Sequence, residues 1–321
     1  MSQVNEKKPV LWIVTEGMAG TENPCLGVAE SLGLSPQIFR IDLRQPWRLL
    51  SPWVGCEQAD TFMPPFPDSW PDILITSGRK ALAASRYIKK QSKGKCFTVH
   101  IQDPRVRAPY VDMIAVPHHD KRRGNRVIVT DGTPSRLNPT FLSEAKKRWA
   151  PVFEPMPAPC IAVLLGGHSK THDMTQQDIK NIAQVIGSLQ AGVMITTSRR
   201  TRADHIAYLK SSLPKDTYIW TGDGENPYAG MLAWADYIFV TEDSVSMICD
   251  AGTTGKPVYV LPMTGGSQKF ARFHAHMQHK GITRPWAGYL ENWTYPPLDD
   301  AGRIAHEINR RLGLYVPARP H

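Results

Sequence analysis

The sequence predicts an α/β protein built from two doubly wound, Rossmann-like domains that face a cleft. Three observations lead to this prediction. The chain of 321 residues is longer than one typical domain. Short apolar runs recur along it, each followed by a turn and a helix-like stretch, which is the pattern of parallel sheets covered by helices. A proline-rich segment at residues 149–159 divides the runs into two series.

The first series predicts the strands of an N-terminal domain at residues 1–150. It opens with an apolar run at residues 10–14, which is typical of a buried parallel strand. Asn23 is expected to cap the first helix and Pro24 to begin it, because the first turn of a helix does not need the N–H that proline lacks. Further strands are expected at residues 38–43, 72–76, 97–101, 113–116 and 127–129.

The second series predicts a C-terminal domain at residues 151–321. The four prolines of residues 149–159 fit poorly into regular structure, so a linker is expected there. Open α/β sheets bind ligands at the carboxyl ends of their strands, so the residues directly after each run are the candidates for a site. Strands are expected at residues 161–165, 193–197, 218–220, 237–240 and 258–261.

The net positive charge of the chain comes almost entirely from the N-terminal half. Residues 1–150 hold 22 Lys and Arg against 14 Asp and Glu, while the whole chain has a net charge of +9. This excess indicates either solubility alone or an anionic partner, such as a phospholipid surface or a phosphorylated acceptor. Residues 46–53 combine Trp, Leu and Arg as membrane-interface segments do, although the same residues could pack against the sheet.

Other features exclude several classes of protein. The five cysteines form no Cys-x-x-Cys pair, so neither a disulfide framework nor a zinc site is indicated, and no metal is expected. No apolar stretch approaches the roughly 20 residues of a membrane span, and residues 1–8 are too polar for a signal peptide. No nucleic-acid-binding motif is present. We expect a cytoplasmic protein whose membrane association, if any, is peripheral.

Ionisable residues at strand ends of the N-terminal domain are candidates for a general base. Glu16 directly follows the first run, and Glu22 lies beside the expected helix start. Asp103 and His119 follow two later runs. We favour Glu16, because Glu22 could merely stabilise the helix start and Asp103 is fixed by the proline after it. Residues 77–80 place two cations at another helix start, an arrangement that favours an anion.

Glycines and arginines after two strands of the C-terminal domain indicate a phosphate-bearing ligand. Gly166 and Gly167 could present backbone N–H groups to a diphosphate. The loop after the next strand contributes Ser198, Arg199 and Arg200, and guanidinium groups suit phosphate geometry. The alternative is that the two arginines belong to a solvated turn.

The strongest pattern lies at residues 235–262, where a strand, a polar turn and a short helix follow one another. Ser244 is a natural N-cap, but a free helix N-terminus at a strand end is also an anion site. Asp250, later in the same helix, could accept both hydroxyls of a ribose. The candidate binding residues of the turn are Glu242, Asp243, Ser244 and Ser246.

This region resembles the donor-nucleotide motif of GT-B glycosyltransferases. The shared spacing is an acidic residue, four further residues and then Gly-x-Pro, with a Ser-rich turn before it. By this resemblance Asp250 takes the place of the ribose-binding acid, which is Glu in that family, and residues 244–246 take that of the diphosphate-binding helix start. Gln268 lies near the position that contacts the donor sugar. The resemblance implies no bound cofactor or metal and a UDP-type nucleotide sugar as co-substrate.

Nearly the whole chain resembles the mitochondrial fission, or elongated-mitochondria, family, and we identify it as a bacterial-type member. Thr21 stands where that family often has His, and Pro24 where it often has Gln, which leaves Glu16 or Glu22 as the base. The resemblance rests on residues 17–23, 77–79, 102–104, 117–120, 198–201, 226–228 and 241–247.

The two resemblances together imply a nucleotide-sugar-dependent glycosyltransferase whose acceptor is unidentified, with lipid-linked and anionic compounds as the candidates. Two alternatives remain. A nucleotide-sugar epimerase would need no acceptor. A non-catalytic adaptor at a membrane surface would match the plant members, which recruit the division machinery to mitochondria.

Overall fold

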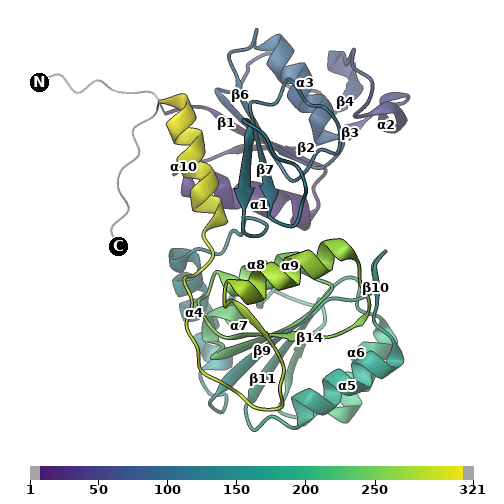
Figure 1. The fold of residues 1–321 in the computed structure, drawn as a ribbon, viewed down its shortest axis with the longest axis vertical. Coiled ribbons are helices and arrows are strands. Elements are labelled where there is room, and N and C mark those ends of the chain that lie inside the picture. The colour runs from purple at the N-terminus through teal and green to yellow at the C-terminus, as the bar shows by residue number, and fades with distance from the viewer. Residues whose placement is uncertain (1–7, 314–321) are drawn as a thin grey trace, which may run out of the picture. The chain divides into compact units, whose positions relative to one another are not determined.

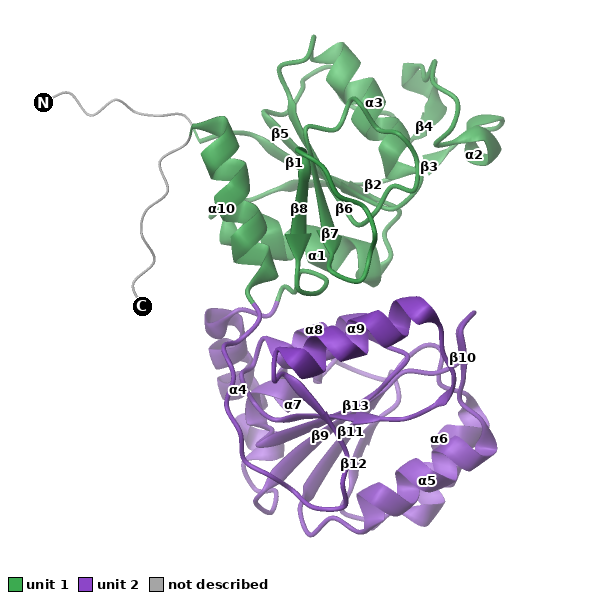
Figure 2. Cartoon of the chain, viewed as in Figure 1, with its two compact units in different colours: residues 1–136, 299–321 green, residues 137–298 purple. Residues whose placement is uncertain are grey.

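A computed structural model describes residues 8–313 and divides the chain into two compact units. Unit 1 comprises residues 1–136 and 299–321, and unit 2 comprises residues 137–298 (Figure 2). Each unit has its own six-stranded sheet, and all strand pairs within these two sheets are parallel. The prediction of two doubly wound, Rossmann-like units is therefore confirmed.

The sheet of unit 1 has the strand order β2-β1-β5-β6-β7-β8. Its strands are β1 (Leu11–Thr15), β2 (Gln37–Arg40), β5 (Ile73–Ser77), β6 (Phe97–Ile101), β7 (Met113–Pro117) and β8 (Val127–Thr130). Its helices are α1 (Ala19–Ser31), α2 (Trp47–Leu50), α3 (Ala81–Gln91) and α10 (Asp300–Leu312) (Figure 1). A short antiparallel pair, β3 (Asp42–Leu43) and β4 (Phe62–Met63), lies beside α2.

Alternate residues of β1 face opposite sides of this sheet, and both sides are buried. Leu11 and Ile13 pack in a cluster with α1 and α10, whereas Trp12 and Val14 pack in a cluster with α3. This is why the strand reads as one continuous apolar run, since a parallel strand covered by helices on both faces has no solvent side.

The sheet of unit 2 has the strand order β12-β11-β9-β13-β14-β16. Its strands are β9 (Cys160–Leu165), β11 (Gly192–Thr197), β12 (Tyr218–Trp220), β13 (Tyr237–Thr241), β14 (Val258–Leu261) and β16 (Thr283–Pro285). Its helices are α4 (Pro139–Phe153), α5 (Gln176–Gly187), α6 (Ala203–Ser212), α7 (Tyr228–Trp234), α8 (Val245–Gly252) and α9 (Gln268–His279). Helices α4, α7, α8 and α9 pack on one face of the sheet, and α5 and α6 on the other.

The boundary between the units differs from the expected one at residue 150. The first five residues of the expected linker at residues 149–159 are the end of α4, which continues to Phe153 with Pro151 inside it, and a turn and irregular structure follow up to β9. Phe153 is fully buried and Trp149 stacks on it, so the packing of this face outweighs the hydrogen bond that a proline removes from a helix interior. The chain passes from unit 1 to unit 2 before this helix begins.

The C-terminal helix α10 returns to unit 1, although the sequence placed it in the C-terminal domain. Ile304 and Ile308 are fully buried in the same cluster as α1 and β1. Burial of two such side chains stabilises the docked helix by roughly 3–6 kcal/mol. Asp300 fixes its first turn, because its carboxylate accepts the backbone N–H groups of Asp131 (2.9 Å) and Gly132 (2.7 Å).

The expected start of the first helix is also wrong. Helix α1 begins at Ala19 rather than after Asn23, and Pro24 lies inside it. The backbone N–H groups of Thr21 and Glu22 already donate to the carbonyl of Met18, so the first turn is complete before Asn23.

Candidate functional site

The strand order of unit 2 reverses between β9 and β13. The chain runs outward from β9 through β11 to β12 and then returns to the other side of β9 as β13. In an open α/β sheet, the carboxyl ends of the strands at such a reversal point form the usual ligand site. The loops that follow β9 and β13 hold Gly166, Gly167, Glu242, Asp243 and Ser244 of the predicted binding residues, and Ser246 and Asp250 lie in helix α8 directly after the second loop.

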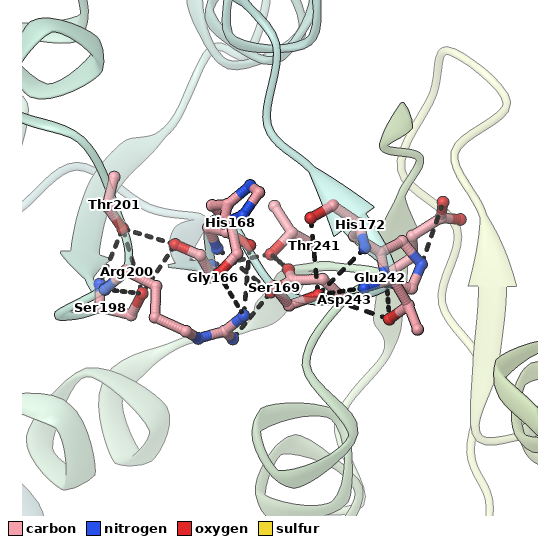
Figure 3. A network of polar contacts seen from close by, with 12 residues as sticks. Gly166, His168, Ser169, His172, Ser198, Arg200, Thr201, Thr241, Glu242 and Asp243 are labelled. Carbon is pink, nitrogen blue, oxygen red and sulfur yellow. Dashed lines mark hydrogen bonds and ion pairs between the residues drawn. The ribbon is translucent and has the colours of Figure 1, made fainter. Parts of the chain in front are cut away.

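Figure 3 shows that these two loops are tied together by hydrogen bonds. The N–H of Gly166 donates to Oγ1 of Thr241 at 2.8 Å, and the N–H of Gly167 donates to Oδ2 of Asp243 at 3.1 Å. The structure therefore brings these predicted residues together, but it gives the two N–H groups partners inside the protein. The buried carboxylate of Asp243 stands where a diphosphate was expected.

Position 166 requires glycine, because the side chain of Asp243 lies directly against its Cα. A Cβ atom on Gly166 would overlap both carboxylate oxygens of Asp243. Only a residue without a side chain lets the loop after β9 lie directly on the loop after β13.

Arg200 balances the charge of Asp243. Its Nη2 lies 2.8 Å from Oδ2 of Asp243, whose side chain is fully buried, and its Nη1 donates to the carbonyl of Gly167 at 3.2 Å. A buried carboxylate needs such a partner, because isolated burial of a charge is costly. Arg200 thus links the loops after β9, β11 and β13.

The two residues before Arg200 in the β11 loop have different environments: Ser198 holds the loop by a hydrogen bond, and Arg199 is an exposed cation. Ser198 Oγ donates to the carbonyl of Gly166 at 2.8 Å, so the side chain of Ser198 holds the loop itself. Arg199 is exposed, and its guanidinium has no hydrogen bond or ion pair with residues 8–313. Of the two arginines predicted to bind phosphate, Arg199 is the one that remains available.

Helix α8 begins directly after the β13 loop, and its N-terminus has no side-chain cap. Ser244 occupies the N-cap position and is buried, but its hydroxyl makes no capping bond. Ser246 in the first turn is exposed, and Asp250 lies one turn further along the same face of the helix. An uncapped helix N-terminus of this kind offers backbone N–H groups and a partial positive charge to an anion.

A second polar network joins the β13 loop to α9. Glu242 accepts the N–H of Met263 at 3.0 Å, and its carboxylate lies 3.9 Å from Nε2 of the buried His172. His274 of α9 hydrogen-bonds the carbonyl of Glu242 at 2.9 Å. Glu242 therefore connects the β13 loop to Met263, to His172 and to helix α9. Gln268 is the first residue of α9 and is exposed.

In unit 1 the strand order reverses between β1 and β5, and Glu16 follows β1 at this point. Its Oε1 accepts the N–H of Lys80 at the start of α3 at 3.2 Å, and its Oε2 lies 3.6 Å from the Lys80 ammonium. The same ammonium pairs with Asp42 at 2.6 Å. Glu16 and Asp42 are thus anions beside the basic helix start for which the sequence predicted an anion.

Two of the other candidate bases are held by arginines. Arg40 donates to both oxygens of Glu22, at 2.8 and 2.7 Å, and these hydrogen bonds lower the pKa of Glu22. Burial raises the pKa of Asp103, but hydrogen bonds from the Arg105 backbone and from Arg122 outweigh it, so the pKa lies below its usual value. A lowered pKa makes a carboxylate a weaker proton acceptor.

His119, the remaining candidate base, is buried in the turn after β7. Residues 8–313 contain no group of three or more His, Cys, Asp or Glu side chains that could hold a metal ion. They also contain no helix with the length and apolar character that a membrane crossing requires.

No sequence pattern indicated a role in the site for Thr241 or His172, and Lys80 was indicated only as part of the basic helix start at residues 77–80, yet the geometry depends on all three. Thr241, Lys80 and His172 hold the loops through hydrogen bonds or ion pairs to segments distant in the sequence. Because these partners are distant in the sequence, no local sequence pattern predicts them. Tyr228 is a different case. It belongs to residues 226–228, on which the family resemblance partly rests, but its contact with Asp250 is visible only in the structure.

Unit 1 exposes apolar side chains around α2. Leu49 is 70% exposed and Trp53 is 65% exposed, whereas Trp47 of the same segment packs against the core. Arg86 anchors the segment, because its guanidinium donates to the carbonyls of Pro52 (3.2 Å) and Val54 (2.7 Å). The segment is therefore fixed to the unit while part of its apolar surface faces outward.

Comparison with protein families identifies the family of the chain. The model of the family described as "Mitochondrial fission ELM1" matches residues 19–312. The chain belongs to this family. It is 30% identical to the mitochondrial fission protein ELM1 of Arabidopsis thaliana over 75% of the chain and 64% of that protein, so it spans less than two thirds of this relative. It is 25% identical to an uncharacterized protein of Rickettsia prowazekii, over 76% of the chain and 80% of that protein.

Solved structures share the fold of this ELM1-family chain at low sequence identity. The UDP-GlcNAc 2-epimerase of Methanocaldococcus jannaschii has a TM-score of 0.51 and 13% identity, over 94% of this chain and 99% of that one. The spinosyn forosaminyltransferase SpnP has a TM-score of 0.50 and 11% identity, over 96% and 95%. These similarities establish the two-unit Rossmann-like architecture of GT-B proteins.

Proposed function

We propose that this ELM1-family protein is a glycosyltransferase that uses a UDP-type nucleotide sugar. The observation that carries the proposal is the uncapped N-terminus of α8 at the strand-order reversal of unit 2, with Ser246 and Asp250 on one face of the helix. The helix start would bind the diphosphate, and Asp250 would accept the ribose hydroxyls. Arg199, exposed on the β11 loop, would add a cation to the phosphates.

The organisation of the β9 loop narrows this proposal. Asp243 already forms an ion pair with Arg200 and accepts the N–H of Gly167. The loop after β9 would therefore act as a rigid support for the site. We assign the diphosphate to the α8 side of the site rather than to Gly166 and Gly167. Ser198 and Glu242 would support the same loops, and Gln268 would contact the donor sugar.

The choice of UDP rests on similarity of fold. The epimerase of Neisseria meningitidis, solved with UDP-GlcNAc bound, shares the fold with a TM-score of 0.50 and 15% identity, over 94% of this chain and 99% of that one. The chemistry of α8 suits any nucleoside diphosphate, since ribose and diphosphate are common to all of them. UDP is therefore the first nucleotide to test.

The proposed reaction transfers the sugar to an acceptor hydroxyl. The acceptor oxygen attacks the anomeric carbon, the bond from that carbon to the diphosphate oxygen breaks, and the nucleoside diphosphate leaves. A base takes the hydroxyl proton. Helix N–H groups and Arg199 would neutralise the leaving diphosphate.

We assign the base to Glu16. Glu22 and Asp103 remain candidates, but their lowered pKa values disfavour them as proton acceptors. His119 also remains. Unit 1 would carry the acceptor, and the excess of basic residues in the N-terminal half favours a lipid-linked or anionic compound.

The experiment compares Glu16→Gln with wild type in an assay of nucleotide-sugar consumption over a panel of acceptors. We expect turnover to fall by at least about 100-fold while donor affinity is kept, because the amide retains the shape but not the basicity. Glu30→Gln is the matched control, since Glu30 pairs with Arg136 in the same unit. Turnover near wild type in Glu16→Gln would move the role to another candidate.

The same assay separates the alternatives. An epimerase would convert the nucleotide sugar without any acceptor. An adaptor would consume no nucleotide sugar under any condition, and the exposed apolar segment around α2 is the feature that such a protein would use.

A further inference from the structure

The segment 226–228, one of those on which the family resemblance rests, has no role in the site described so far. In the structure the hydroxyl of Tyr228 donates to Oδ2 of Asp250 at 3.0 Å. These two residues are 22 positions apart and belong to different helices, α7 and α8. The contact brings Tyr228 to the carboxylate that is proposed to receive the ribose.

The three residues of the segment place this tyrosine at the start of α7. The side chain of Asn226 accepts the backbone N–H of Tyr228 at 3.0 Å, and the buried Pro227 is the N-cap residue of the helix. Met231 and Leu232 then bury the helix in the core beneath β9. The phenol is therefore presented by an element that is packed into the core rather than by a free loop.

An aspartate benefits from such a partner. The χ2 torsion of Asp has broad minima, so packing alone leaves the plane of its carboxylate poorly fixed. A hydrogen bond to one oxygen fixes that plane and still leaves lone pairs on both oxygens, because a carboxylate has about four acceptor sites. Recognition of the two adjacent hydroxyls of a ribose depends on this plane, since both oxygens must face the two donors.

Tyr228 keeps its proton under all ordinary conditions. Burial of the phenol and the nearby charge of Asp250 raise the pKa of Tyr228 well above its usual value, although part of the residue reaches the surface. The hydroxyl is thus a constant donor to Asp250 and never a competing anion.

The position of Asp250 on α8 fits the length of a nucleotide. Ser246 and Asp250 lie four residues apart, which corresponds to a rise of roughly 6 Å along the helix. A diphosphate at the helix start and a ribose one turn further along match this separation. Tyr228 acts on the ribose end alone.

We propose that Tyr228 is a positioning residue that orients the Asp250 carboxylate to recognise the ribose hydroxyls of the bound nucleotide. This inference rests on the proposed function. It assigns a role to residues 226–228 and predicts that the role concerns the ribose and not the phosphates.

Isothermal titration calorimetry with UDP and 2′-deoxy-UDP tests the inference. In wild type, loss of the 2′-hydroxyl should weaken binding by about 10- to 100-fold, because that hydroxyl donates to a charged group. In Tyr228→Phe the difference between the two nucleotides should shrink to about threefold or less, and in Asp250→Asn it should shrink similarly. Circular dichroism and thermal unfolding verify that each variant is folded.

Tyr237→Phe is the matched control. Tyr237 also donates a phenol hydrogen bond, to Asn292 at 2.6 Å, but it begins β13 and so lies at the opposite end of the strand from the α8 loop. This variant should keep the wild-type discrimination between the nucleotides. A purely structural role for the Tyr228 hydroxyl would lower both affinities by the same factor.

The outcomes are distinguishable. UDP binding with an unchanged ratio in Tyr228→Phe, or an equal loss of discrimination in Tyr237→Phe, overturns this inference and leaves the proposed function standing. Failure of the wild type to bind UDP or any other nucleoside diphosphate overturns the proposed function, and this inference with it.

Discussion

The guanidinium of Arg200 lies 2.8 Å from the fully buried carboxylate of Asp243, and this ion pair joins the loops after β11 and β13. The carboxylate also accepts the N–H of Gly167 and the hydroxyl of Thr241. Three strand ends of unit 2 thus meet on one acidic side chain.

Loss of this charge should destabilise unit 2. We expect Asp243→Asn to lower the free energy of unfolding by about 2–3 kcal/mol, because Arg200 and the Gly167 N–H lose a charged acceptor. Urea unfolding measures the change. The control is Asp204→Asn, which breaks the exposed pair with Arg202 in the same unit and should cost less than about 1 kcal/mol. Equal effects of the two substitutions would contradict a structural role for Asp243.

The exposed Arg199 should act in binding rather than in folding. Arg199→Ala should weaken UDP binding by about 1.5–3 kcal/mol, because a guanidinium–phosphate contact is charge-assisted, while the unfolding midpoint stays near wild type. Calorimetry and thermal unfolding measure the two quantities. The exposed Arg202, three residues further on, serves as a control for loss of one positive charge. Unchanged affinity in Arg199→Ala would remove this residue from the site.

The apolar surface around α2 should bind anionic vesicles reversibly at low salt. Leu49 and Trp53 are exposed beside Arg48, a composition that suits a membrane interface. In vesicle sedimentation, the double change Leu49→Ser and Trp53→Ser should reduce partitioning by at least about tenfold, given the apolar area removed. Tyr289→Ser, at an exposed aromatic residue of unit 2, should change little. Equal sedimentation with neutral and anionic vesicles would count against this surface as a membrane site.

Unit 1 should lose stability in mild acid through His100. Burial lowers the pKa of His100 to about 3, so the unfolded chain, in which His titrates near 6.5, binds a proton more readily than the folded chain. Stability is therefore lost as the pH falls below about 6.5. From pH 7 to pH 5 the loss should reach about 2 kcal/mol.

A comparison of His100→Asn with wild type isolates this effect. The variant lacks the titrating ring, and so its free energy of unfolding should fall by about 2 kcal/mol less over the same pH range in urea titrations. His306→Asn, at an exposed position of α10, should behave like wild type. Identical pH dependence in wild type and His100→Asn would show that His100 is not the responsible group.

The sequence predicted those features of the fold that depend on local pattern. Strands β6, β12 and β14 have the expected bounds, because each is a short apolar run that is visible in the sequence. The pattern failed where tertiary packing outweighs local preference. Pro151 sits inside α4 because Phe153 and Trp149 are packed, and α10 returns to unit 1 because Ile304 and Ile308 fill its core.

The site was predictable as a set of loops but not as a set of contacts. The reversal in strand order brings together the loops that the sequence singled out. The sequence does not show that Asp243 accepts the backbone N–H of Gly167 or that Arg40 pairs with Glu22, because these partners come from distant segments. Whether a charged residue faces a ligand or another residue is decided by the tertiary fold.

Hydrogen–deuterium exchange with and without UDP tests the central claim most directly, because it measures binding and locates it in the same experiment. The account predicts slower exchange on addition of UDP in residues 241–252, which include the start of α8 and Asp250, and in residues 198–201 of the β11 loop, with the core strands unchanged. No change in exchange at saturating UDP, or protection confined to unit 1, would contradict the claim that unit 2 binds a nucleoside diphosphate at α8.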